Sequence, residues 1–267
     1  MKTTINLSNE LVKLSHSTNA TKQISFNLFG KLFFVLRFVV ILFVSAVAVF
    51  AQSDAVQPVP RLDGWWTSRF VTSIVQMDKG NIDLLMIGDS ITHGWENQGK
   101  DIWNEYYTKR NAINLGISGD RTQHVLWRLD HLPLNKISPK AAVVMIGTNN
   151  IGGKDASPKD TADGIKTIVD RLQKQFPDIK IILLNVFPRG EKPEDGRRKL
   201  VDEINSYLPN IFKEYKNVKL LDINHVFLDE NKILPKSIMP DSLHPNKDGY
   251  KLWAEAVEPS LVEIFGK

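Results

Sequence analysis

Apolar runs of strand length alternate with amphipathic segments along residues 65–267. The predicted strands are residues 82–87, 112–115, 141–146, 180–186 and 218–223. Within several of these runs apolar residues follow one another instead of alternating with polar ones. That pattern is typical of strands that are buried on both faces of a parallel sheet.

The segments between the runs carry helical signals. Ser157-Pro158 combines a capping residue with a proline suited to the first helical turn, and apolar residues then recur at helical spacing until Phe176-Pro177. Further predicted helices are residues 122–129, 197–215 and 247–265. Strands that alternate with helices predict an α/β fold, in this case a doubly wound sandwich with a parallel sheet of five strands.

The N-terminal region predicts export. Residues 38–50 form an apolar stretch behind Lys31 and Arg37, and small residues precede a cleavage site after Ala51. This pattern is typical of a secretory signal peptide, which predicts a secreted or periplasmic protein. If residues 32–51 insert in a bilayer and stay uncut, the same segment is an anchor and the membrane becomes a partner. Residues 52–64 are predicted to be a linker, and residues 65–267 a single folded domain.

Charge and cysteine content exclude several classes of function. Residues 1–51 hold five of the 34 basic residues and one of the 30 acidic residues, so the remaining chain carries 29 of each. A neutral domain gives no electrostatic support to a nucleic-acid partner. The chain has no cysteine, which excludes disulfides, a cysteine nucleophile and cysteine-ligated metal. No spacing of His, Asp and Glu indicates a metal site, and no cofactor is expected.

Four short polar segments stand where such a fold gathers its functional groups. Two of them directly follow predicted strands and one ends a predicted strand, and the carboxyl ends of parallel strands share one edge of the sheet. The fourth precedes the last predicted helix. The segments are Gly88-Asp89-Ser90, Asn114-Leu115-Gly116, Gly147-Thr148-Asn149-Asn150 and Asp241-Ser242-Leu243-His244.

The residue types in these segments fit nucleophilic catalysis. Ser90 is a weak nucleophile unless a base lies within hydrogen-bond reach, and the His244 imidazole is suited to that task. Asp241 stands three residues before His244, so one turn places both side chains on the same side. A carboxylate there holds the imidazole tautomer and stabilises the imidazolium. Taken alone, Ser90 is equally suited to cap a helix, and His244 to lie near a helix start.

An oxyanion needs donors near the nucleophile. The backbone N–H of Gly116 is one candidate because glycine has no side chain to obstruct a close approach. The side-chain amide of Asn149 and the N–H of Ser90 are the others, and each such donor is worth roughly 3 kcal/mol in the transition state. Gly116 as a simple turn glycine and Asn149 as a turn residue are the alternative interpretations.

The four segments, in this order, resemble the conserved blocks of the SGNH (GDSL-type) hydrolases. Residues 116–129 and 187–193 are also similar to stretches of the catalytic subunits of intracellular platelet-activating factor acetylhydrolases. The resemblance implies a flavodoxin-like three-layer α/β/α sandwich and a metal-independent hydrolase. It implies Ser90 as nucleophile, His244 and Asp241 as base and orienting acid, and Gly116 and Asn149 as the oxyanion hole. It also leaves a homodimer open.

The expected function is that of a secreted serine esterase that removes short acyl groups, acetyl above all. The resemblance to acetylhydrolases supports acetyl, and export favours acetylated carbohydrate as the substrate. A lipid acyl-ester hydrolase or thioesterase is the enzymatic alternative. A non-catalytic binding module on the same fold would need a broken triad or oxyanion hole, and neither is seen in the sequence.

Overall fold

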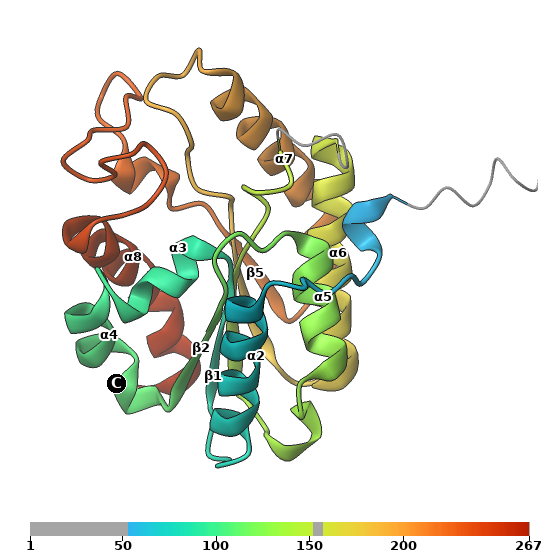
Figure 1. Cartoon of the computed structure of the whole chain (residues 1–267). Coiled ribbons are helices and arrows are strands. Elements are labelled where there is room, and N and C mark those ends of the chain that lie inside the picture. The colour runs from blue at the N-terminus through green and yellow to red at the C-terminus, as the bar shows by residue number, and fades with distance from the viewer. Residues whose placement is uncertain (1–52, 152–156, 267) are drawn as a thin grey trace, which may run out of the picture. The chain divides into compact units, whose positions relative to one another are not determined.

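The computed structural model describes residues 53–151 and 157–266, so the predicted leader and its cleavage site lie outside the described residues. Five parallel strands form one sheet with helices on both faces (Figure 1). The strands are β1 (Leu84–Gly88), β2 (Ala112–Gly116), β3 (Ala141–Met145), β4 (Lys180–Leu184) and β5 (Val218–Leu221). Their order is β2-β1-β3-β4-β5, the flavodoxin-like doubly wound order, which confirms the predicted fold.

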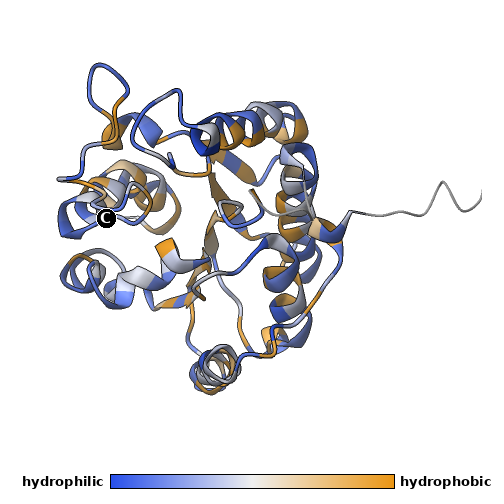
Figure 2. Cartoon of the chain, turned by 45° about the horizontal axis from the view of Figure 1, so that its top comes forward, coloured by the Kyte–Doolittle hydropathy of each residue, from blue (hydrophilic) through white to orange (hydrophobic). Residues whose placement is uncertain are grey.

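Two helical layers cover the sheet. One face carries α2 (Gly64–Met77), α5 (Thr122–His131), α6 (Pro158–Gln175) and α7 (Gly196–Phe212). The other carries α3 (Ser90–His93), α4 (Lys100–Tyr106) and α8 (Lys247–Phe265). Short 3-10 turns are η1 (Asp54–Val56), η2 (Gly94–Glu96), η3 (Thr108–Arg110), η4 (Leu134–Lys136) and η5 (Asn224–Phe227). Figure 2 shows apolar positions gathered in the strands and on the inner sides of these layers.

The central strands form where the sequence predicts them because both of their faces are covered. Every residue of β1 and β3 is buried, which explains apolar runs without alternation. The fourth predicted strand, residues 180–186, is longer than β4. Val186 is fully buried, but its N–H donates to the Asn205 side chain at 2.8 Å instead of extending the ladder.

Local capping sets the start of α6. The Ser157 hydroxyl accepts from the N–H of Asp160 at 3.1 Å, and the Asp160 carboxylate accepts from the N–H of Ser157 at 2.9 Å. This reciprocal box precedes Pro158, the first helical residue, as the sequence predicts. The C-terminal helix α8 is joined to the α4 region by two ion pairs, Lys247–Asp101 at 2.6 Å and Glu258–Arg110 at 2.7 Å.

Residues 53–63, here called the N-terminal strap, belong to the predicted linker, yet they pack on the domain. Ala55 is fully buried, and its carbonyl accepts from the Thr122 hydroxyl at 2.7 Å. The N–H of Val59 donates to the carbonyl of Gln123 at 3.2 Å. The strap therefore lies against the start of α5 before the chain enters α2. Across the two described ranges, none of the helices combines the length and apolar character needed to cross a bilayer.

Candidate active site

Ser90 lies at the carboxyl end of the central strand β1. The strand ends at Gly88, Asp89 caps α3, and Ser90 is the first residue of that helix. The turn is tight because a Cβ on Gly88 would lie 2.1 Å from the Thr92 hydroxyl and 2.4 Å from the carbonyl of Met145. Glycine at this position lets the chain reverse closely enough to present Ser90 at the rim of the sheet.

A chain of hydrogen bonds links the predicted nucleophile, base and acid. His244 Nε2 lies 2.9 Å from Ser90 Oγ, and His244 Nδ1 lies 2.6 Å from Asp241 Oδ2. The second Asp241 oxygen accepts from the backbone N–H groups of Leu243 and His244 at 3.1 and 2.7 Å. The turn thus holds the carboxylate against the imidazole. The structure brings together residues that stand 154 positions apart in the sequence.

The charge of Asp241 is stabilised within this turn. Partial burial acts to raise its pKa, but hydrogen bonds from the His244 ring, from the His244 N–H and from the Leu243 N–H together hold the pKa below its ordinary value. An ionised carboxylate accepts only, so His244 Nδ1 is assigned the proton and Nε2 faces the Ser90 hydroxyl as an acceptor. This is the tautomer that general-base catalysis needs.

Gly116 does not offer the free donor that the sequence predicts. It is the last residue of β2 and is buried, and its N–H donates to the Asn114 side-chain oxygen at 2.9 Å. Gly119, three residues later, is exposed and has a φ of +78°, which favours glycine. Its N–H finds no acceptor among residues 53–151 and 157–266. Gly119 therefore replaces Gly116 as the candidate backbone donor.

Asn149 stands on the loop after β3 and points toward the loop after β2. Its Nδ2 donates to the backbone carbonyl of Asp120 at 3.0 Å. A side-chain amide has two N–H donors, and the second meets no acceptor in the described part of the chain. Asn149 and Gly119 thus lie on neighbouring loops, each with a donor to offer.

Beneath these loops lies a buried ion pair that the sequence did not reveal. Asp120 and Arg128 are joined at 2.8 Å, and neither side chain is more than 1% exposed. The second Asp120 oxygen accepts from the Trp66 indole at 2.7 Å. Arg128 also donates to the carbonyls of Leu115 and Gly88, at 2.7 and 3.3 Å, where β2 and β1 end. The network fixes both strand ends that carry the site.

Comparison with known proteins identifies the family. The model of the GDSL-like lipase/acylhydrolase family matches residues 86–252, well over half of the chain. The chain belongs to this family. The resemblance read from the four sequence segments is therefore confirmed, and the chain is an ester-hydrolysing enzyme.

Similar proteins agree with this assignment. The human platelet-activating factor acetylhydrolase IB subunit alpha2 is 35% identical over 203 residues, covering 76% of this chain and 86% of that protein. The rat alpha1 subunit is 30% identical over 220 residues, covering 81% and 92%. A GDSL-like lipase of Bacteroides thetaiotaomicron has a TM-score of 0.57 at 22% identity, covering 74% and 96%. An acetylxylan esterase of Geobacillus stearothermophilus has a TM-score of 0.54 at 20% identity, covering 70% and 95%. These two structures support the fold alone.

Two other residues near the motifs of this GDSL hydrolase, Trp95 and Arg189, make contacts that support the fold. Trp95 is fully buried in an aromatic cluster, 5.0 Å from Tyr107 and 4.9 Å from Trp253 between ring centroids, so it belongs to the core. Arg189 donates to the carbonyl of Thr148 at 2.7 Å and thereby supports the loop that carries Asn149. Across the described ranges, no three His, Asp or Glu side chains are grouped to hold a metal ion.

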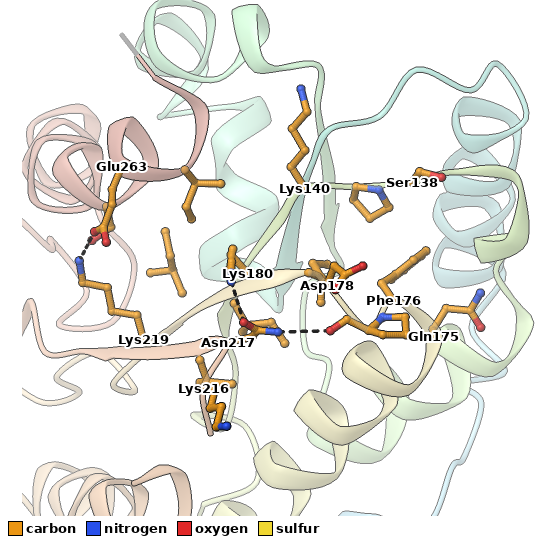
Figure 3. Close-up of a pocket in the computed structure, with 18 residues that line it drawn as sticks. Ser138, Lys140, Gln175, Phe176, Asp178, Lys180, Lys216, Asn217, Lys219 and Glu263 are labelled. Atoms are coloured by element: carbon orange, nitrogen blue, oxygen red, sulfur yellow. Dashed lines mark hydrogen bonds and ion pairs between the residues drawn. The ribbon is translucent and has the colours of Figure 1, made fainter. Parts of the chain in front are cut away.

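The structure contains a hollow of about 750 Å³, whose lining residues are drawn in Figure 3. Its lining includes Lys180 and Val218, the first residues of β4 and β5, so it opens at the amino ends of strands. Ser90 stands past the carboxyl end of β1, at the other edge. Lys180 donates to the Asn217 side chain at 2.7 Å, and Lys219 pairs with Glu263 at 2.8 Å. These contacts occupy two of the lining lysines.

Asp89, the residue before the nucleophile, is a buried carboxyl with one free oxygen. Its Oδ1 accepts from the N–H of Ile91 at 3.0 Å, while Oδ2 has no partner among the described residues. Burial raises the pKa of Asp89 to about 7, against the hydrogen bond from Ile91, and the nearby Asp120 charge adds to the rise. The carboxyl caps α3 through Oδ1 in either protonation state.

The raised pKa predicts an unusual pH dependence of stability. The pKa of Asp89 is about 7 in the folded protein and has the ordinary value of 3.8 in the unfolded chain, so between these pH values the folded state binds more protons. The free energy of unfolding therefore falls as the pH rises through this interval. Asp89→Asn removes the titration and keeps the acceptor for Ile91. In urea unfolding at several pH values, the wild type should lose up to about 1.4 kcal/mol per pH unit relative to this variant.

A second variant separates the charge of Asp89 from its cap. Asp89→Ala also removes the titration, but it leaves the Ile91 N–H without its acceptor, at a cost of about 1 kcal/mol at every pH. Parallel pH profiles for the wild type and Asp89→Asn would show that the carboxyl does not titrate in this interval.

Proposed function

We propose that this enzyme hydrolyses short-chain carboxylic esters, acetyl esters of carbohydrates foremost, through a Ser90–His244–Asp241 triad. The observation that carries the proposal is the continuous hydrogen-bond chain from Asp241 to His244 to Ser90, with distances of 2.6 and 2.9 Å. Such a chain activates a serine hydroxyl as a nucleophile.

The proposed reaction has two halves. His244 Nε2 takes the Ser90 proton while Oγ attacks the acyl carbonyl, and Asp241 stabilises the imidazolium. The imidazolium then protonates the leaving alcohol as its C–O bond breaks, which leaves an acyl-enzyme on Ser90. In the second half His244 takes a proton from water, the resulting hydroxide attacks the acyl carbon, and the proton returns to Ser90 Oγ as the carboxylic acid leaves.

Three donors are proposed for the oxyanion of both tetrahedral intermediates. They are the N–H of Ser90, the N–H of Gly119 and the side-chain amide of Asn149. Gly119 takes the place first expected of Gly116 because its N–H is unengaged within the described ranges, whereas that of Gly116 is bonded to Asn114. Donors that are already fixed in position stabilise the developing negative charge of the oxyanion most, since they do not have to reorganise.

Relatives support acetyl as the acyl group. The names of the sequence relatives describe acetylhydrolases of platelet-activating factor, and one structural neighbour is an acetylxylan esterase. The leader pattern in residues 1–51 supports export, where acetylated polysaccharide is an accessible ester. A lipid acyl ester is the second candidate, because the matching family includes lipases and acylhydrolases.

A panel of nitrophenyl esters tests the proposal. Purified enzyme should turn over the acetate ester fastest, with kcat/KM falling as the acyl chain lengthens, and it should release acetate from acetylated xylan. A maximum at long acyl chains would move the assignment to lipid esters. Absence of turnover on every ester, by protein that unfolds cooperatively, would contradict the esterase proposal itself.

A further inference from the structure

Arg61 of the N-terminal strap is held against the loop between β2 and α5, which carries Gly119. One of its terminal nitrogens donates to the carbonyl of Ser118 at 2.7 Å. Its other nitrogens donate to Asp63 at 3.0 and 2.8 Å, and its guanidinium lies 5.0 Å from the Trp65 ring centroid. The side chain is only 20% exposed. Arg61 is therefore held on three sides, and its contact with Ser118 is well defined.

The carbonyl that Arg61 binds belongs to the same peptide group as the N–H of Gly119. The described residues contain no cis peptide, and in a trans peptide the C=O and N–H bonds point in opposite directions. Arg61 on the carbonyl therefore directs the N–H of Gly119 away from itself. Gly119 also leaves room for the arginine, because a Cβ there would lie 2.8 Å from its terminal nitrogen.

The same loop is held on its other sides by groups next to the triad. The Ser118 hydroxyl lies 3.0 Å from Nδ1 of His93, which is in the short helix that begins with Ser90. The carbonyl of Asp120 accepts from Asn149 at 3.0 Å. Residues 118–120 are thus bonded to Arg61, to His93 of α3 and to Asn149 of the loop after β3.

We propose that Arg61 is a positioning residue for the oxyanion hole, an inference that rests on the esterase function proposed above. Its positive charge on the Ser118 carbonyl polarises the peptide and strengthens the N–H of Gly119 as a donor. It also fixes the direction of that N–H before substrate arrives. Residues 53–63, which the sequence predicts to be a linker, would then help to arrange the oxyanion hole.

Kinetics of full-length Arg61 variants test this role. Removal of a whole oxyanion donor costs about 10² to 10³ in kcat, so Arg61→Met, which weakens one donor, should lower kcat of the acetate ester about 10- to 100-fold. KM should change less than about threefold, because the ground-state carbonyl gains little from the donor. The rate of Ser90 labelling by a fluorophosphonate should fall in parallel, since labelling also builds charge on an oxygen in the same hole.

Two conservative variants separate the positive charge of Arg61 from its capacity to donate a hydrogen bond. Arg61→Lys keeps the charge and a donor, and Arg61→Gln keeps a neutral donor, so kcat should decrease from wild type to lysine to glutamine. The pH profile of kcat/KM should keep its shape, because His244 and Asp241 are untouched. The matched control is Arg171→Met, which removes an arginine paired with Asp130 between α6 and α5, and its kcat should equal that of the wild type.

The outcomes are distinct. Arg61→Met with the kcat of the control would overturn the proposal, as would equal kcat for the lysine and glutamine variants. If the methionine variant does not fold, the comparison of lysine with glutamine decides. A wild-type enzyme without ester turnover would instead refute the proposed function, and the role of Arg61 would fall with it.

Discussion

Ser90→Ala should reduce the turnover of short esters by at least about 10⁴-fold, with a thermal midpoint close to that of the wild type. The variant removes the atom that lies 2.9 Å from His244 Nε2, while Asp241, His244 and the proposed oxyanion donors stay in place. Stability should hold because the lost group is a partly exposed hydroxyl. Steady-state kinetics and thermal unfolding of the same preparations give both values.

The loss should be specific to this serine. Ser68→Ala, on the exposed side of α2, removes a hydroxyl that donates to the carbonyl of Gly64 in the same helix and should leave turnover unchanged. His244→Gln should lose about as much activity as Ser90→Ala, because members of a triad act as a unit. A Ser90→Ala enzyme that retained one-hundredth of the wild-type kcat would refute Ser90 as the nucleophile.

Asp120→Asn should destabilise the folded enzyme by about 3 to 5 kcal/mol, the usual cost of leaving a buried charge without its partner. Arg128 is 1% exposed and pairs with Asp120 at 2.8 Å, so the substitution leaves the guanidinium charge uncompensated in the interior. Urea unfolding, with the midpoint and slope both fitted, measures the change.

Two further variants test whether that loss of stability comes from the unpaired charge of Arg128. Asp120→Asn combined with Arg128→Met should recover part of it, because no unpaired charge then remains, although the carbonyls of Leu115 and Gly88 lose a donor. Asp130→Asn, in an exposed pair with Arg171, should cost at most about 1 kcal/mol. A loss below about 1 kcal/mol for Asp120→Asn would show that the buried pair is not ionised.

The sequence predicts the strands well, but it does not predict α2, α3 or α4. Apolar runs mark the strands because both faces of the sheet are covered, so burial leaves a simple pattern. Helix α2 has buried Trp66 and Phe70, but Trp65, Val71 and Val75 are about half exposed. Apolar residues on the solvent side obscure the helical period, and the helix cannot be recognised from hydrophobicity alone.

The convergence of Ser90 with the candidate oxyanion residues follows from the sequence because the sheet is parallel, whereas Asp241 and His244 were paired by their spacing of three residues. Parallel strands place their carboxyl ends at one edge, so residues after β1, β2 and β3 converge there whatever their separation. The choice between Gly116 and Gly119 does not follow in this way. It depends on whether Asn114 folds back on the N–H of Gly116, a contact that no spacing records.

The buried network and the strap were missed for different reasons. Arg128 stands among the apolar residues of a helix, near Leu126 and Leu129, and a charge in such a place signals a buried partner. The partner itself, Asp120, lies in the loop before the helix. The strap is polar and contains prolines, which is the composition of a linker, and only its contacts with Thr122 and Ser118 reveal its place in the domain.

The long separation of the triad members has a consequence for synthesis. His244 is added 154 residues after Ser90, which at 5 to 20 residues per second takes roughly 8 to 30 s. A nascent chain that has completed β5 holds the five strands of the described sheet but lacks the proposed base, because Asp241 and His244 follow that strand and precede α8. On the proposed mechanism, chains that stop before His244 are inert toward esters, and activity requires the segment that follows β5.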